Sequence, residues 1–287
     1  MKRIAVIGAG TMGHGIAQVA ALAGFTTTLT DAEPASLPRA VERIKVNLAG
    51  GVSRGKLSRD AADAALERLS TSTNLAEAVQ KADLIVEAIV EDLGAKQSLF
   101  AAVENAAGAS AVLATNTSSL SIAAIAQATD HPERVLGMHF FNPVHIMKLV
   151  ELVTHDGVDA AVVERVRDVA VRMGKEPIIV KNSPGFASSR LGIALGLEAM
   201  RMVEEGVATP EDIDKALELG YGHPMGPLRV SDLVGLDVRL SIAEYLHAEL
   251  GAPHFAPPDI LRRLVRDNHL GKKTGRGFYE WPKNVSS

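Results

Sequence analysis

The chain has 287 residues, 47% hydrophobic and 22% charged, with a formal net charge of −4 and no cysteine. This composition is typical of a folded globular protein, and it excludes a disordered chain, a disulfide framework and a thiolate metal site. The negative charge argues against a protein that binds nucleic acid by neutralising phosphates.

The first half of the chain alternates short apolar segments with helical patterns. Strands are predicted at 3–7, 26–30, 84–89, 111–114, 135–141, 149–153 and 177–180. Several are continuously apolar, as expected where helices cover both faces of a sheet. Helices are predicted at 12–23, 37–48 and 75–81, and Asn74 and Glu77 form a capping-box pattern at the start of the last one. This alternation predicts an α/β domain with a doubly wound, mostly parallel sheet.

The pattern changes after the segment VKNSPGF. Ser183 and Pro184 are typical of an N-cap and a first helical residue. The helix expected after them is apolar on nearly every face until Gly206 ends it. Such a helix is buried within its own domain or by a second subunit.

A further helix is predicted from Thr209, an N-cap residue, to Gly220. No strong strand signal follows it. We therefore predict two domains, 1–182 and 183–287, of which the second is all helical.

A glycine pattern in RIAVIGAGTMGHG follows the first strand directly. Gly8 permits a tight turn, Gly10 lets the backbone approach a pyrophosphate, and Gly13 allows the helix to pack closely on the strand. The N-terminus of that helix would face the phosphate charge. These features predict a Rossmann-like dinucleotide site, for which the alternative is a glycine-rich turn without a ligand.

Asp31 ends the second strand, 23 residues after Gly8. A carboxylate at this place accepts hydrogen bonds from a ribose diol and repels a 2′-phosphate, so NAD is favoured over NADP. If Asp31 only caps a turn, the ribose preference stays open. The residues predicted here to bind the cofactor are Gly8, Gly10, Thr11, Met12, Gly13 and Asp31.

Two ionisable residues stand in apolar segments, His139 in GMHFF and Glu151 in KLVELV. Burying either is costly unless it has a partner. The loop NPVHIM between the two strands could bring them together at the end of the sheet where ligands bind. A carboxylate on one imidazole nitrogen lets the other exchange a proton with a substrate. The alternative is a satisfied core pair, and the neighbouring dinucleotide site favours catalysis.

The segment LATNTSSLS places polar residues 116–119 between a strand and a helix. At the rim of the sheet they could hydrogen-bond cofactor and substrate, or they could serve as N-caps for the helix after Ser121. The nine histidines lack metal-binding spacing such as HxxxH, so no metal site is predicted.

Together these segments resemble the L-3-hydroxyacyl-CoA dehydrogenases, specifically the short-chain 3-hydroxybutyryl-CoA type. The likeness covers nearly the whole chain, through GAGTMG, VEAIVED, NTSSLS, GMHFFNPV, KLVELV, PGF, GHPMGPL, DLVGLD and GKKTGRGFY. It implies NAD-dependent interconversion of (S)-3-hydroxyacyl-CoA and 3-oxoacyl-CoA, with His139 and Glu151 as the catalytic pair. It also implies that Ser118 contacts the region of the substrate's 3-oxygen. The implied contacts of the cofactor's ribose and nicotinamide end are Glu91, Lys96 and Asn116.

One position departs from the family pattern. The segment PGFASSRLG has Ser189 where the family usually has an asparagine that helps hold the acyl oxygen. A serine hydroxyl can donate the same bond over a shorter distance, directly, through a water, or with help from Ser188. We predict retained but altered activity.

The CoA portion of the substrate has a weaker signature. Between Arg39 and Arg59 there are six basic residues and one acid, an excess that could receive phosphates. By the family likeness, Asn47 and Arg54 contact CoA, and we add Lys56. A solvated helix face is the alternative.

The likeness also implies a homodimer formed through the helical domain. Rival functions are a β-hydroxyacid dehydrogenase acting on a free acid and a nucleotide-binding protein without catalysis. A free-acid dehydrogenase that acts through a catalytic lysine would carry it on the first helix of the second domain, but residues Pro184 to Val203 contain no lysine. A DNA-binding sensor would need a basic helix to read DNA, and the sequence shows none. Neither a nucleic-acid nor a membrane partner is expected. Glycines interrupt the apolar start MKRIAVIGAG, which argues against a secretion signal, so a cytoplasmic protein is predicted.

Overall fold

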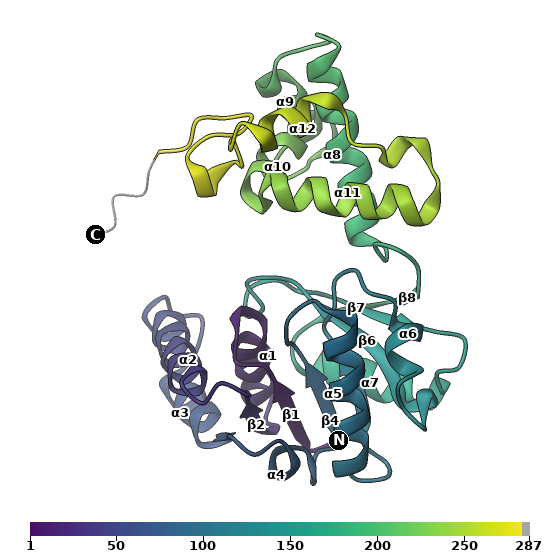
Figure 1. Cartoon of the computed structure of the whole chain (residues 1–287). Coiled ribbons are helices and arrows are strands. Elements are labelled where there is room, and N and C mark those ends of the chain that lie inside the picture. Colours follow the sequence, from purple (N-terminus) through teal and green to yellow (C-terminus); the bar gives the residue numbers. More distant parts are fainter. Residues whose placement is uncertain (283–287) are drawn as a thin grey trace. The chain divides into compact units, whose positions relative to one another are not determined.

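The computed structural model describes residues 1–282. The chain falls into two compact units, the first from Met1 to Ser183 and the second beginning at Pro184. The first unit combines a sheet with helices and the second is helical (Figure 1). The predicted fold class is therefore confirmed. Within residues 1–282, no helix has the length and apolar character needed to cross a membrane.

The sheet of the first unit has eight strands in the order β3-β2-β1-β4-β5-β6-β7-β8. The strands are β1 (Arg3–Ile7), β2 (Thr26–Thr30), β3 (Leu69–Ser72), β4 (Leu84–Glu87), β5 (Val112–Thr115), β6 (Val135–Phe140), β7 (Leu149–Thr154) and β8 (Glu176–Lys181). Neighbouring strands are parallel except β6 and β7, which are antiparallel. The chain thus reverses direction once within the sheet, and β7 and β8 run opposite to the other six strands.

Helices cover both faces of this sheet. They are α1 (Thr11–Leu22), α2 (Ser36–Ser53), α3 (Arg59–Glu67), α4 (Leu75–Val79), α5 (Leu93–Ala106), α6 (Ile122–Ala126) and α7 (Ala160–Arg172), with a 3₁₀ turn η1 (Pro132–Arg134). One apolar core includes residues of α1, α2, α3 and α7, and the other includes residues of α4, α5 and α6. Along β1, Ile4 and Val6 join the first core and Ala5 and Ile7 the second. Burial on both faces explains why these strands are continuously apolar.

The second unit packs its helices around a core of its own. They are α8 (Ser188–Glu204), α9 (Pro210–Tyr221), α10 (Pro227–Val234), α11 (Leu236–Leu250) and α12 (Asp259–Arg266), with 3₁₀ turns η2 (Pro253–Phe255) and η3 (Lys272–Thr274). Fully buried residues of this core include Leu228, Leu236 and Leu246. The core contains only residues of the second unit, so the unit has a hydrophobic centre separate from the sheet.

Two buried aspartates hold the C-terminal segment onto these helices. Asp214 in α9 accepts hydrogen bonds from the backbone N–H groups of Leu228 and Arg229, in the first turn of α10, and from the Tyr279 hydroxyl at 2.7 Å. Burial raises the pKa of the Tyr279 phenol, and the hydrogen bond to Asp214 and its negative charge raise it further. Asp214 therefore connects α9, α10 and the segment that contains Tyr279.

Asp232 in α10 is fully buried and also holds the C-terminal segment. Its carboxylate accepts hydrogen bonds from the backbone N–H groups of Phe278 and Tyr279, each at 3.0 Å, and from Nε1 of Trp281 at 2.8 Å. A Cβ at Gly277 would collide with this carboxylate, so only glycine fits there. The motifs DLVGLD and GKKTGRGFY thus meet at one side chain.

The predicted start of the first helix in the second unit is wrong. Ser183 and Pro184 are not its N-cap and first residue, because α8 begins at Ser188. Between them, Gly185 and Phe186 have φ angles of 73° and 48°. Left-handed residues cannot continue a right-handed helix, so the helix starts only after them.

Other boundaries also differ from the prediction. α9 extends to Tyr221 and is followed by Gly222 in the left-handed conformation, so Gly220 does not end it. The sequence patterns also gave no indication of β3 or α3. β3 is a short edge strand of sequence LSTS without buried residues, and it lacks the apolar signal by which the other strands were recognised.

We predict that Asp232→Ala strongly destabilises the protein. It removes the acceptor of three donors, two of them backbone N–H groups, and hydrogen bonds to charged groups contribute about 1.5–3 kcal/mol each. We therefore expect a loss of about 3 kcal/mol or more in the free energy of unfolding, measured by urea denaturation followed by circular dichroism. Asp267→Ala, at an exposed acid, should change it by less than about 0.5 kcal/mol. Equal stability of the two variants would contradict this account of Asp232.

Candidate active site

The turn between β1 and α1 is built around glycines that no larger residue could replace. Gly8 has a φ of 102°, and a Cβ there would collide with the Ala88 carbonyl of the loop after β4. A Cβ on Gly13 would collide with the Gly8 carbonyl. In contrast, a Cβ on Gly10 would meet no atom within 4 Å. The turn therefore brings strand and helix into close contact and leaves open space at Gly10.

The N-terminus of α1 is prepared for an anion. Its N-cap, Gly10, has no side-chain cap, and its first turn has no acidic residue. The backbone N–H groups there and the positive end of the helix dipole suit a pyrophosphate. Asp31, at the end of β2, accepts from the backbone N–H groups of Ala9 at 2.6 Å and Glu33 at 2.8 Å. The carboxylate thus holds the glycine turn while facing the same space.

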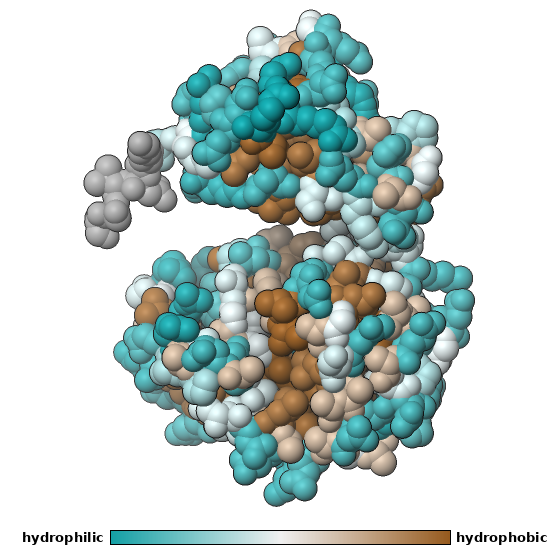
Figure 2. All heavy atoms as spheres, in the orientation of Figure 1, coloured by the Kyte–Doolittle hydropathy of each residue, from teal (hydrophilic) through white to brown (hydrophobic). Residues whose placement is uncertain are grey.

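These groups line a pocket of about 690 Å³. Its walls include Gly8, Gly10, Thr11, Met12, Asp31, Ala88, Ile89 and Val90. Apolar residues gather on the first unit between α1 and α5 (Figure 2). An anion-ready helix end, an acid at the end of β2 and an apolar wall fit NAD: they match its pyrophosphate, its ribose hydroxyls and its ring systems.

His139 and Glu151 face each other across the single antiparallel step of the sheet. They are register partners on β6 and β7, and Nδ1 of His139 lies 2.8 Å from Oε2 of Glu151. The exposed fractions are 6% for the histidine and 0% for the glutamate. The ring of Phe141 lies 4.5 Å from the imidazole, between centroids. The prediction that the two ionisable residues are partners is confirmed, and the pairing orients the imidazole.

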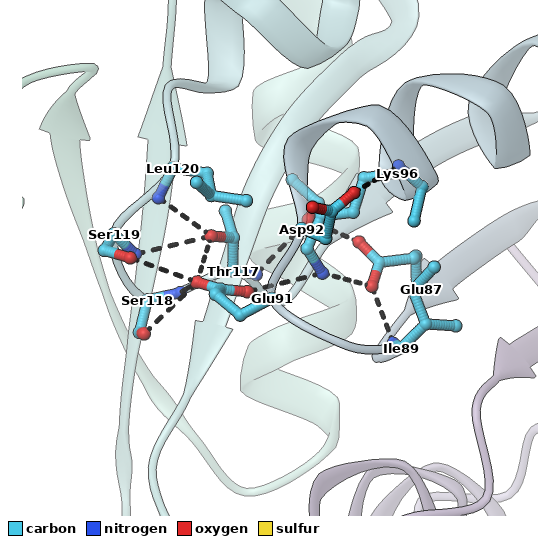
Figure 3. Close-up of polar contacts among 11 residues, drawn as sticks. Glu87, Ile89, Glu91, Asp92, Lys96, Thr117, Ser118, Ser119 and Leu120 are labelled. Carbon is cyan, nitrogen blue, oxygen red and sulfur yellow. Dashed lines mark hydrogen bonds and ion pairs between the residues drawn. The ribbon is translucent and has the colours of Figure 1, made fainter. Parts of the chain in front are cut away.

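Glu91 collects the donors of the turn at 117–119, as Figure 3 shows. Its Oε1 accepts from the Thr117 hydroxyl at 2.5 Å and the Ser118 backbone N–H at 2.9 Å, with the hydroxyls of Ser118 and Ser119 at 3.3 Å. Burial alone would raise the pKa of the Glu91 carboxyl, but the Thr117 hydrogen bond and the charge of Lys96 outweigh it and hold the pKa below its usual value. Glu91 is therefore a fixed negative charge that anchors Ser118.

Lys96 and Asn116 are also held by partners within the first unit. Lys96 is 1% exposed, and its ammonium lies 2.5 Å from Glu87 and 3.4 Å from Glu91. Oδ1 of Asn116 accepts from the backbone N–H of Phe140 at 2.8 Å. That bond ties the end of β5 to the strand that holds His139. Sequence reasoning missed Glu87, although an acid that ends the apolar segment LIVE is the same kind of signal that identified Glu151.

A second pocket, of about 360 Å³, adjoins the first. Its walls include Glu91, Lys96, Asn116, Ser118, His139 and Asn142. Both pockets are also lined by Met12, Ala88 and Ile89, so they share a wall. The arrangement places a proton-exchanging histidine beside a dinucleotide site, as the oxidation of an alcohol or the reduction of a ketone requires.

The remaining predicted site residues lie outside these two pockets. Asn47 donates to Oε1 of Gln18 at 3.1 Å, and Arg54 and Lys56 are exposed around the end of α2. Ser189 is in the first turn of α8 in the second unit. Their roles stay predictions. Within residues 1–282 there is no group of three or more His, Asp or Glu side chains arranged to hold a metal ion.

Comparison with known families covers both units. Residues 3–183 match the family described as 3-hydroxyacyl-CoA dehydrogenase, NAD binding domain. Residues 185–281 match 3-hydroxyacyl-CoA dehydrogenase, C-terminal domain. The two matches follow one another in the order of the two units.

Individual relatives agree with the family matches. The chain is 43% identical over 286 residues to a probable 3-hydroxybutyryl-CoA dehydrogenase of Bacillus subtilis, covering 100% of this chain and 99% of the relative. It is 44% identical over 283 residues to a 3-hydroxybutyryl-CoA dehydrogenase of Mycobacterium tuberculosis, covering 98% and 99%. The crystal structure of (S)-3-hydroxybutyryl-CoA dehydrogenase from Ralstonia eutropha superposes with a TM-score of 0.95 at 36% identity, covering 99% and 100%. The chain therefore belongs to the 3-hydroxyacyl-CoA dehydrogenase family and is an NAD-dependent enzyme of that family.

Proposed function

We propose that this enzyme interconverts (S)-3-hydroxybutyryl-CoA and acetoacetyl-CoA. The observation that carries the proposal is the buried His139–Glu151 pair, whose histidine lines a pocket that shares residues with the dinucleotide pocket. The short acyl chain is supported by full-length relatives named for that substrate. A free-acid substrate is the second candidate, and the assay described below separates the two.

In this proposal the histidine moves the proton of the reaction. Held at the glycine turn and Asp31, NAD would supply the acceptor for the hydride of C3, and NADH would supply the hydride donor for the reverse reaction. As C3 is oxidised, Nε2 of His139 takes the proton of the 3-hydroxyl group, and the electron pair of that O–H bond completes the carbonyl. Glu151, bonded to Nδ1, stabilises the resulting imidazolium. In reduction, His139 returns the proton to the carbonyl oxygen.

Further residues would orient the substrate. Ser118 lines the same pocket as His139 and is anchored by Glu91, so its hydroxyl is a suitable partner for the 3-oxygen. Arg54 and Lys56, both exposed, would attract the CoA phosphates. Asn47 lies in α2, the helix whose C-cap is Arg54. Ser189 would assist in holding the acyl oxygen. The cytoplasmic location stays a prediction.

We also propose a homodimer formed through the helical unit. α8 leaves Leu191 and Leu195, one turn apart, 72% and 37% exposed. α10 packs on α8 and leaves Leu233 and Val234 exposed. Apolar residues ringed by hydrophilic ones gather over α10 in Figure 2. Exposed apolar patches of this kind mark protein–protein contacts, which favours a second copy of the helical unit as the partner.

Purified protein should oxidise NADH with acetoacetyl-CoA, and it should react poorly with free acetoacetate or with NADPH. Because general base catalysis contributes about 10²–10⁴-fold, His139→Gln and Glu151→Gln should each lower kcat by about 10²-fold or more. NADH affinity, measured by fluorescence titration, should be unchanged in the His139→Gln variant. His131→Gln, at an exposed histidine of the same unit, serves as the control and should keep full activity. Activity with free acetoacetate alone would contradict the proposed CoA thioester substrate and favour a free acid.

Replacing Ser189 with the family's usual residue tests its proposed role. An asparagine amide reaches further than a serine hydroxyl, so Ser189→Asn should change kcat or the KM for acetoacetyl-CoA by at least about threefold, while Tm stays within ~2 °C. Steady-state kinetics and a thermal melt measure both. If neither kcat nor KM moves, Ser189 does not take part in holding the acyl group.

Sedimentation velocity of the full chain should give about twice the chain mass of 30.3 kDa. The double substitution Leu191→Asp and Leu195→Asp puts charges into the proposed contact and should shift the protein to the monomer mass. Val171→Asp, at an exposed apolar residue of α7, should leave the dimer intact. A dimer that survives the double substitution would place the contact elsewhere.

A further inference from the structure

Glu87 is a buried acid that the proposed reaction does not use. It ends β4 and is 1% exposed. Its Oε1 accepts from Nζ of Lys96 at 2.5 Å and from the backbone N–H of Ile89 at 2.7 Å, and its Oε2 accepts from the Thr115 hydroxyl at 2.6 Å. One carboxylate therefore joins β4, the loop after it, helix α5 and the end of β5.

The contacts of Glu87 continue to the pocket of His139. Lys96, held by Glu87, also lies 3.4 Å from Oε2 of Glu91, whose other oxygen accepts from Thr117 and Ser118. Figure 3 shows this continuous series from Glu87 through Lys96 and Glu91 to the turn at 117–119. In addition, the Thr115 hydroxyl that donates to Glu87 accepts from the Thr117 backbone N–H at 3.2 Å. The turn that holds Ser118 is thus connected to Glu87 by two routes.

Glu87 also fixes residues that line both pockets. Its bond to the Ile89 backbone N–H holds the loop that places Ala88 and Ile89 in both pocket linings. Glu87 itself lines neither of these two pockets. Its carboxylate therefore acts on the pocket linings through the groups it holds.

We propose that Glu87 is a positioning residue for the reaction: through Lys96 and Glu91 it sets the place of Ser118, and through Ile89 it sets the wall shared by the cofactor and substrate pockets. This inference rests on the proposed function for its kinetic test. Its binding test needs only the NAD site. An acid with a purely structural role would affect folding stability and leave the reaction of the folded enzyme unchanged.

Glu104 supplies a matched control within the same unit. Its carboxylate, 11% exposed, accepts from one cation, Arg134, and from the backbone N–H groups of Asp130 and His131. It is at the other end of α5 from Lys96 and lines neither of the two pockets. Glu104→Gln therefore removes the negative charge of a comparable ion pair without touching the series that leads to Ser118.

The test compares Glu87→Gln, Glu104→Gln, Ser118→Ala and the double variant Glu87→Gln/Ser118→Ala, each in the full chain. Thermal melts measure stability, fluorescence titration measures the Kd for NADH, and steady-state kinetics measure kcat and KM with acetoacetyl-CoA. Glu87→Gln should lower kcat at least tenfold and raise the Kd for NADH at least threefold. Glu104→Gln should keep both within twofold of the unsubstituted enzyme at a similar loss of Tm.

The double variant tests whether Glu87 acts through Ser118, because residues that act as a unit have non-additive effects. With Ser118 already replaced, Glu87→Gln should lower kcat by less than threefold more. The proposal would be overturned if the effects of Glu87→Gln and Ser118→Ala on kcat multiplied fully. It would also be overturned if Glu87→Gln and Glu104→Gln lowered kcat and the affinity for NADH equally. If the unsubstituted enzyme binds NADH but does not reduce acetoacetyl-CoA, the proposed substrate fails instead. The difference in NADH affinity between Glu87→Gln and Glu104→Gln then still decides the role of Glu87 at the shared wall.

Discussion

The cost of removing a carboxylate from water governs both units of this protein. Glu87, Glu151, Asp214 and Asp232 are each no more than 3% exposed, so each needs donors from the protein itself. Each acid receives a donor from an element other than its own, and every one of these acids consequently joins two or more elements. In the helical unit the two aspartates attach the segment 278–281 to α9 and α10. In the sheet unit the two glutamates hold the side chains and loops around the pockets.

The reversal of direction between β6 and β7 is what makes the His139–Glu151 pair possible. In an antiparallel pair, residues directly opposite each other carry their side chains on the same face of the sheet, close enough to interact. His139 and Glu151 occupy such a position, on two strands joined by a short loop. A parallel β7 would need a long crossover connection between the strands, and the loop between them is only eight residues long, 141–148. The antiparallel step therefore belongs to the catalytic geometry as much as to the fold.

Sequence reasoning recovered the features that are encoded locally. The apolar strands, the glycine turn with Asp31, and the caps at Asn74 and Thr209 all follow from short patterns, and the structure contains each of them. The start of α8 was misjudged because Ser183-Pro184 is a valid local start signal, whereas the left-handed Gly185 packs against Leu246, some sixty residues away. The contacts of Glu91 with Thr117 and Ser118 also could not be derived from spacing, because they depend on β4 and β5 being neighbours. For Glu91, only the likeness to known dehydrogenases pointed to a role.

The wall formed by Met12, Ala88 and Ile89 has a thermodynamic consequence. A molecule that contacts these residues in one pocket alters the surface that a molecule in the other pocket encounters. The occupancies of the two pockets are then linked, and linkage of this kind is reciprocal. If bound dinucleotide changes the affinity for the acyl thioester by a given factor, bound thioester changes the affinity for the dinucleotide by the same factor.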